Sequence, residues 1–255
     1  MRIAVCLSGQ LRKWELGWEN QNWFWTANQN YQVDFFSHTW TYSWDRTSVS
    51  KPYIKRDVTK EEHSRFVERF QIKKSIFDDT PQTEFGNSDH WGGLFYSFVN
   101  SLLLKKEYEL ENDFTYDIVI KSRPDVVFNP KLFLHFPELN DGVLYTTHGG
   151  IMEGELNMVN FNDCVFLGNN RTMDLLMNIF HYRMHKITIP EENVHPLGPG
   201  VLMNEYFRDF GIYPVANNLV FIETILREGC PEDLDLFNTE EFALMEKYFR
   251  DWYTN

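Results

Sequence analysis

Three short apolar runs, each followed at once by polar residues, limit the folds open to this chain more than any other feature. The runs begin at Ile3, Val33 and Tyr116, and they lead into the segments SGQLR, SHTW and KSRPD. Compact apolar runs of this kind are typical of strands buried on both faces of a parallel sheet. Helical patterns separate the runs, at Trp14–Asn30 and at Gly93–Leu110. The alternation predicts an α/β fold with a mixed, mostly parallel central sheet flanked by helices.

Local signals place further elements along the chain. Thr59 and Glu62 have the Thr-x-x-Glu spacing of a capping box, which predicts a helix directly after Thr59. Thr172 is expected to cap a helix that runs to Ile187. Polar residues 41–58 and 79–90 are expected to form turns and loops. The other expected strands are 72–78, 142–150, 163–168 and 219–226, and the other expected helices are 198–211 and 240–253.

Composition narrows the class of protein. The chain has 255 residues, of which 43% are hydrophobic and 16% aromatic, and this predicts a globular protein of one large domain or two small ones. Because no internal repeat, low-complexity tract or Gly/Ser linker divides the sequence, we expect a single domain, residues 1–255. A formal net charge of −13 argues against DNA or RNA as the main ligand, although a local basic groove would still allow DNA to bind. Three widely spaced cysteines indicate a reducing compartment without a disulfide framework. Because no signal-peptide core or long apolar run is present, we expect a cytoplasmic protein with no membrane segment.

The polar segments at the three strand ends suggest a ligand site. Ligands of open α/β sheets bind beyond the carboxyl ends of parallel strands, so these segments converge if the strands are parallel neighbours. The planar guanidinium of an arginine suits phosphate oxygens, and a carboxylate beside cations suits a divalent ion that bridges to phosphates. We therefore expect a diphosphate site in which the carboxylate faces either a metal ion or a sugar hydroxyl. The residues expected to converge are Ser8, Gly9, Arg12, His38, Arg123 and Asp125.

Several blocks taken together resemble a known family. The blocks CLSGQLR, VDFFSHTW, GGLFYSFVNSLLLKKEYE, YDIVIKSRPDVVF and NDCVFLGNNRTMD look like the GT-A-type glycosyltransferases of large DNA viruses, phages and bacterial surface-polysaccharide clusters. The resemblance covers Ile3 to about Gly211, with gaps around residues 41–89. It implies a GT-A-like, Rossmann-like fold, with a nucleotide-binding half at about 1–128 and an acceptor and donor-sugar half at about 129–255. It also implies a nucleotide-sugar donor, such as a UDP-sugar.

The resemblance also implies roles for particular residues. Many relatives carry an Asp-x-Asp motif that holds Mn²⁺ or Mg²⁺, whereas the matching triplet here is Arg123-Pro124-Asp125. Only the last acid is kept, so either Asp125 holds the metal or donor sugar, or Arg123 supplies the positive charge itself. The loop at residues 195–200 is similar to the segment that closes over the diphosphate. The assigned residues are Asp125 and Asp163 for catalysis, Asp125 for a metal, and Ser8, Gly9, Arg12, His38, Arg123, His195, Gly198 and Gly200 for the nucleotide and its diphosphate.

The expected activity is transfer of a hexosyl or pentosyl unit from a nucleoside-diphosphate donor to an acceptor hydroxyl. The acceptor is a glycan or a hydroxymethylated nucleobase, and the acidic charge disfavours DNA. A non-catalytic nucleotide-sugar or glycan-binding module on the same scaffold is the alternative. Each residue also has a structural interpretation. Asp125 suits a turn after proline, Arg12 a solvated helix start, His38 a strand end and Asp163 a strand start.

Overall fold

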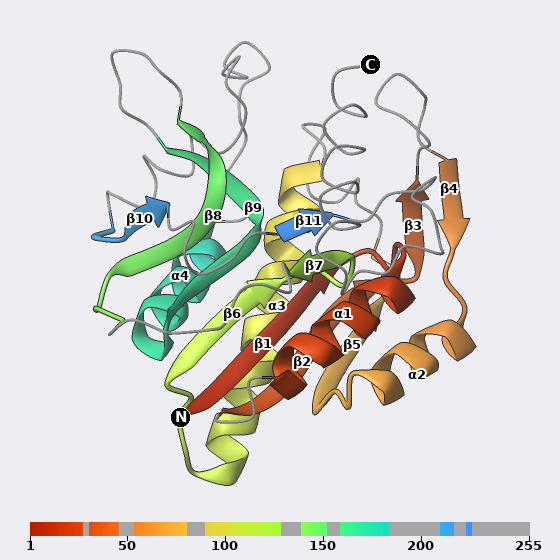
Figure 1. The fold of residues 1–255 in the computed structure, drawn as a ribbon, viewed down its shortest axis with the longest axis horizontal. Helices are drawn as coiled ribbons and strands as arrows, with labels where there is room; N and C mark the ends of the chain where they lie inside the picture. Colours follow the sequence, from red (N-terminus) through yellow and green to blue (C-terminus); the bar gives the residue numbers. More distant parts are fainter. Residues whose placement is uncertain are drawn as a thin grey trace.

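A mostly parallel sheet forms the centre of the molecule (Figure 1). The computed structural model describes residues 1–27, 31–45, 54–80, 90–128, 139–151, 159–183, 210–216 and 223–225. Within them, a seven-stranded sheet has the order β10-β8-β9-β6-β1-β2-β5. Only β9 runs antiparallel to its neighbours in this sheet, so the predicted fold class is confirmed. The bounds are β1 Arg2–Gly9, β2 Gln32–Trp40, β5 Lys74–Asp78, β6 Ile118–Ser122, β8 Val143–Ile151, β9 Val159–Asn169 and β10 Tyr213–Ala216.

Strand β1 lies in the middle of the parallel part of the sheet, between β2 and β6. Successive side chains of a strand point to opposite faces, so its uninterrupted apolar run fills two cores. Ile3, Val5 and Leu7 belong to one core, and Ala4 and Cys6 belong to the other. All five residues are fully buried, which explains why β1 has no polar face.

The helices divide between the two faces. Helices α1 (Trp14–Ala27) and α2 (Lys60–Arg69) contribute Phe24 and Phe66 to the core that contains Leu7. Helices α3 (His90–Asn112) and α4 (Asn170–Arg183) contribute Phe98 and Met173 to the opposite core. In α3, the i, i+3, i+4, i+7 pattern of apolar residues that begins at Phe95 turns one face of the helix toward the sheet.

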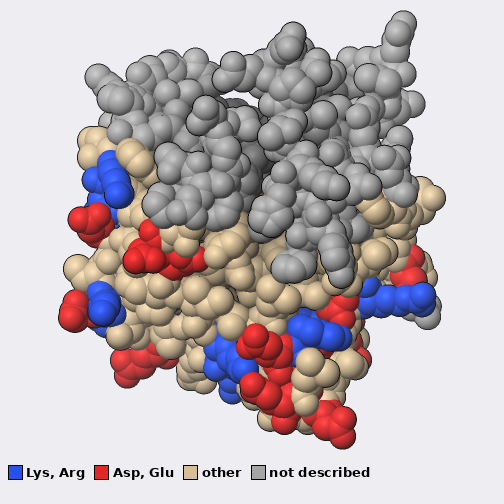
Figure 2. Space-filling view, turned by 180° about the vertical axis from the view of Figure 1, so that it is seen from behind, with Lys and Arg blue, Asp and Glu red and all other residues tan. Residues whose placement is uncertain are grey.

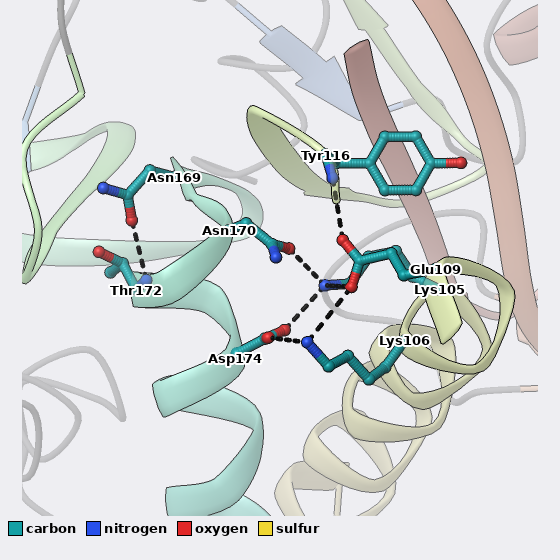
Figure 3. A network of polar contacts seen from close by, with 8 residues as sticks. All are labelled: Lys105, Lys106, Glu109, Tyr116, Asn169, Asn170, Thr172 and Asp174. Atoms are coloured by element: carbon teal, nitrogen blue, oxygen red, sulfur yellow. Dashed lines mark hydrogen bonds and ion pairs between the residues drawn. The ribbon is translucent and has the colours of Figure 1, made fainter. Parts of the chain in front are cut away.

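A partly buried network of charged side chains joins α3 to α4 (Figure 3). Lys105 is fully buried, and its Nζ donates to Glu109 at 3.2 Å and to Asp174 at 2.7 Å. Lys106 Nζ lies 2.6 Å from Asp174 Oδ2 and 3.4 Å from Glu109 Oε2. Glu109 also accepts the backbone N–H of Tyr116 at 2.9 Å. The network therefore fixes both helices and the entry to β6 against one another.

Some expected elements differ from those in the structure. Residues 41–58 are not just a turn, because β3 (Tyr42–Asp45) and β4 (Ile54–Asp57) pair there as an antiparallel hairpin. Helix α4 begins at Asn170, before Thr172, and it is the Asn169 side chain that accepts the Thr172 N–H at 2.8 Å. The capping residue was therefore misplaced, since both residue types serve as N-caps.

Other expectations stand as predicted or fall outside the described residues. Thr59 caps α2, and its hydroxyl accepts the Glu62 N–H at 3.1 Å, as the capping box predicts. After β6 ends at Ser122, residues 126–128 form β7, which pairs antiparallel with β11 (Glu223–Ile225) in a separate two-stranded sheet. The expected helices at 198–211 and 240–253 lie largely or wholly outside the described residues.

Side chains of both charges lie on one face of the described part of the molecule. On the face seen in Figure 2, basic and acidic side chains are interspersed rather than gathered by sign. Lys74, for example, lies between two acids of α3, 3.3 Å from Glu107 and 2.5 Å from Glu111. None of the helices in the described part of the chain has the length and apolar character needed to span a membrane.

Candidate functional site

The carboxyl ends of β2, β1 and β6 lie side by side, as the sequence predicts for parallel neighbours. The register pairs Ser8 with His38, Gly9 with Thr39, and Leu7 with Ser122. The polar segments that follow these strands therefore begin at one edge of the sheet. Gly9 has φ +119°, a conformation that favours glycine, and it turns the chain away from β1.

The loop after β1 is held by side chains from its surroundings. The Gln10 side-chain oxygen accepts a hydrogen bond from Arg12 Nη2 and another, at 2.7 Å, from the Trp44 N–H of β3. Arg56 of β4 donates to the Leu11 carbonyl at 2.7 Å. The hairpin that was expected to be a turn therefore supports the loop, and Gln10 orients the Arg12 guanidinium.

His38 belongs to a hydrogen-bonded chain that crosses the same edge. Its side chain is fully buried, with Nδ1 3.0 Å from Ser97 Oγ and Nε2 3.0 Å from Asp78 Oδ2. Ser97 of α3 also accepts the Gly9 N–H at 2.9 Å. The hydrogen bond from His38 is the main reason that the pKa of Asp78 lies well below its usual range. These contacts give His38 a structural role, and its contact with phosphate stays a prediction.

Arg123 and Asp125 form a two-pronged ion pair directly after β6. Arg123 Nε donates to Asp125 Oδ1 at 2.8 Å, and Nη2 donates to Oδ2 at 2.5 Å. The Asp125 side chain is fully buried, whereas 16% of the Arg123 side chain is exposed. The cation is therefore the accessible partner of the pair, and the carboxylate lies behind it.

Helix α1 fixes the turn that carries this ion pair. Gln21 Nε2 donates to the Val126 carbonyl at 2.9 Å and to the Arg123 carbonyl at 3.2 Å. A Cβ atom on Gly17 would lie 2.0 Å from the Pro124 carbonyl oxygen, so the helix and the turn touch backbone to backbone. Arg12 stands two residues before α1, whose first turns lie against Pro124 and Asp125. Arg12 and Asp125 thus lie at the same edge of the sheet.

The residues described at this edge do not fit the divalent cation that the family resemblance implies. Each Asp125 oxygen accepts a hydrogen bond from Arg123, and the second lone pair of each oxygen is closed off from solvent because the side chain is fully buried. Among the described residues, no three His, Cys, Asp or Glu side chains form a group that could hold a metal ion.

Of the remaining assigned residues, one is placed by the register of β9 against β6, and the others lie outside the described residues. In the antiparallel pair of β6 and β9, Lys121 is opposite Phe166. Asp163 lies three residues earlier in β9 and so falls beyond the end of β6, on the edge that carries Arg123. His195, Gly198 and Gly200 lie outside the described residues.

Sequence reasoning missed the residues that support the site. Ser97, Asp78 and Gln21 come from elements remote in sequence, and no local motif marks any of them. Gln10 lies within the SGQLR segment, which was assigned to the site, but its side-chain amide was given no role. Tyr96 adds an aromatic side chain, whose ring stacks on that of Trp40 with the ring centroids 5.9 Å apart. Burial is the main reason that the pKa of Tyr96 is raised.

Comparisons with known proteins add distant likenesses only. No protein-family model and no curated protein matches the chain. A glycosyltransferase involved in the glycosylation of the major capsid of PBCV-1 is similar at 11% identity and TM-score 0.43, over 86% of this chain and 83% of that one. The apo form of the glycosyltransferase GlyE of Streptococcus pneumoniae TIGR4 gives 14% identity and TM-score 0.37, over 84% of this chain and 44% of its own.

An inositol-1-phosphate CTP transferase from T. maritima gives 12% identity and TM-score 0.42, over 96% and 94% of the two chains. The structural neighbours thus include glycosyltransferases and a nucleotidyltransferase. All three TM-scores are below 0.5, so the fold class rests on the strand order of this chain and not on these likenesses.

Proposed function

We propose that the chain is a cytoplasmic glycosyltransferase that moves a sugar from a nucleoside-diphosphate donor to an acceptor hydroxyl. The observation that carries the proposal is the meeting of three strand ends, two of which lead into Arg12 and Arg123, at one edge of the sheet. The ordered sequence blocks that resemble GT-A-type glycosyltransferases support the same activity. A glycan is the favoured acceptor, and a hydroxymethylated base in DNA is disfavoured by the net charge of −13.

The proposed mechanism assigns the charge of the leaving group to arginine. Breaking the anomeric C–O bond leaves the electron pair on a nucleoside diphosphate, and fixed positive charge stabilises it. Arg12 and Arg123 are both oriented by protein acceptors, Gln10 and Asp125, and so need little reorganisation. In an inverting reaction the acceptor hydroxyl loses its proton to a carboxylate base. We assign that role to Asp163, because the Asp125 carboxylate is fully buried.

The alternative is a nucleotide-sugar-binding module without turnover. The engagement of Asp125 by Arg123 favours it, because a carboxylate shielded in this way contributes neither a base nor a metal ligand. Both hypotheses predict binding of a nucleotide sugar, and only the enzyme predicts release of nucleoside diphosphate.

The test measures nucleoside diphosphate released from a panel of UDP-, GDP- and dTDP-sugars, with and without mono- and disaccharide acceptors. We expect release by the wild-type chain, and a fall of about 10²–10⁴-fold in turnover for Asp163→Asn with donor affinity retained, as for loss of a general base. Asp141→Asn is the matched control, since Asp141 is exposed and pairs with Arg171 away from this edge. Donor binding without any release would instead establish the binding module.

A further inference from the structure

We propose that the nucleoside diphosphate binds without a divalent cation, and that Arg123, positioned by Asp125, supplies the charge that a metal ion supplies elsewhere. This inference rests on the proposed function, because it takes a nucleoside diphosphate as the ligand. It reverses the role assigned to Asp125 from the sequence. The acid is a positioning residue for Arg123, and it does not touch the ligand.

The geometry of the pair leaves the carboxylate committed to the guanidinium. Each Asp125 oxygen accepts from a different nitrogen of Arg123, at 2.8 and 2.5 Å, which is the two-pronged arrangement that fixes an arginine in both position and plane. A cation that bound the second lone pair of an Asp125 oxygen would have to enter the fully buried side of the pair. It would also stand beside the guanidinium, and like charges repel.

Burial points in the same direction. A divalent cation keeps several water ligands in protein sites, so its carboxylate ligands must face solvent or the substrate phosphates. The Asp125 side chain is fully buried, and the accessible part of the pair, 16% of its side chain, belongs to Arg123. An approaching diphosphate therefore meets the cation of the pair and not the anion.

The turn around the pair is braced against a rearrangement that would expose the acid. Gln21 holds the carbonyls of Arg123 and Val126, and the backbone of Pro124 is pressed against Gly17. Because α1 holds the backbone of the turn on both sides of Asp125, it opposes a backbone change that would expose the side chain. Arg12 provides a second cation at the same edge, and it is oriented independently through Gln10.

The experiment titrates the 255-residue chain calorimetrically with UDP, GDP, CDP and ADP, once in EDTA and once with MnCl₂. For whichever nucleotide binds, we expect dissociation constants that agree within about threefold between the two buffers, a difference of about 0.7 kcal/mol. In parallel, titration of the free chain with Mn²⁺, followed by electron paramagnetic resonance, should detect no tight site. Binding that EDTA abolishes and Mn²⁺ restores would overturn the inference while leaving the proposed function standing.

Two substitutions separate the arginine fork from simple charge. Arg123→Lys keeps the charge and loses the planar fork, so we expect nucleotide affinity to fall by about tenfold or more in both buffers. Asp125→Asn removes the charge that orients Arg123, and affinity should again fall equally with and without Mn²⁺. Arg171→Lys is the matched control, because that arginine is 81% exposed in its pair with Asp141.

Circular dichroism and thermal melting establish that each variant is folded before its affinity is compared. If Asp125→Asn leaves affinity in EDTA unchanged but removes an enhancement by Mn²⁺, Asp125 is a metal ligand and the inference is wrong. If none of the four nucleotides, nor any nucleotide sugar, binds in either buffer, the proposed function fails as well, so the two failures are distinct.

Discussion

Backbone and side-chain groups at the carboxyl edge of the sheet are held in place by side chains of the protein. Ser97 receives the Gly9 N–H, Gln10 receives the Arg12 guanidinium, and Asp125 receives that of Arg123. A site that is ordered in advance loses less freedom when its ligand binds. At this scale the carboxyl edge of the sheet consists of hydrogen-bond donors, and each donor is oriented by a different residue.

Asp78 provides a test of the chain that runs through His38. The folded protein holds the pKa of Asp78 below its usual range, mainly through the hydrogen bond from His38. On acidification the unfolded chain therefore takes up this proton first, so the stabilisation is complete above about pH 4 and is lost as the pH falls further. We expect Asp78→Asn to lower the free energy of unfolding by about 1–3 kcal/mol at neutral pH.

The measurement is urea denaturation of both proteins at a series of pH values from neutral to acid. The variant should show a shallower loss of stability below about pH 4, because it lacks this carboxyl group. Asp79→Asn is the control, since Asp79 is the exposed neighbour in the chain. Parallel acid profiles for the wild type and Asp78→Asn would contradict the assignment.

The sequence predicted which residues stand at the strand ends, and it could not predict what they contact. Ser8, Gly9 and His38 follow apolar runs, and strand ends are visible as a change from apolar to polar residues. The partner Ser97 comes from the middle of an apolar helix, where a serine carries no signal of its own. Arg123 and Asp125 are only two residues apart, but the burial of their ion pair depends on α1, which lies far away in sequence.

At the scale of elements, α3 is the part that links the edge to the opposite end of the sheet. Its Ser97 contacts the loop after β1, and its Lys105 and Glu109 join α4 and the start of β6 (Figure 3). The apolar face of α3 was predicted from its spacing, and the charged cluster was not. Lysine and glutamate four residues apart are usually a solvated pair on a helix surface, so the spacing gives no sign of burial.

Lys105→Met tests this network, because methionine keeps much of the side-chain volume without the charge. The substitution leaves Glu109, only 2% exposed, and Asp174 with Lys106 as their remaining cation. Removing one partner of a buried ion pair leaves an uncompensated charge, so we expect a loss of about 3–5 kcal/mol in unfolding free energy.

Arg171→Ala is the comparison for the network. Its pair with Asp141 is 81% and 56% exposed, and exposed pairs contribute about 0–1 kcal/mol. Chemical denaturation of the two variants side by side measures the difference. Equal effects of the two substitutions would show that the Lys105 network does not stabilise the helix pair.

At the scale of the whole molecule, both cores are built on the same strands. Odd-numbered residues of β1 enter the core beneath α1 and α2, and even-numbered residues enter the core beneath α3 and α4. Side chains alternate between the two faces of a strand, but because both faces are buried the sequence shows only an unbroken apolar run. The order of the strands could not be predicted, because it depends on pairings between segments such as β5 and β2, or β9 and β6.

A shared sheet predicts one cooperative unfolding transition for the described residues, whichever core is weakened. Phe24 and Phe98 are fully buried on opposite faces, and each Phe→Ala change should remove about 3–5 kcal/mol. For a chain of this size, that corresponds to a fall of about 6–20 °C in Tm. Leu110→Ala, at a side chain that is 74% exposed, should leave Tm nearly unchanged.

Calorimetry, far-UV circular dichroism and tryptophan fluorescence should report the same shifted midpoint for Phe24→Ala and for Phe98→Ala, since neither core keeps its strands when the other melts. Two separated transitions, with each substitution moving a different one, would mean that the faces unfold independently.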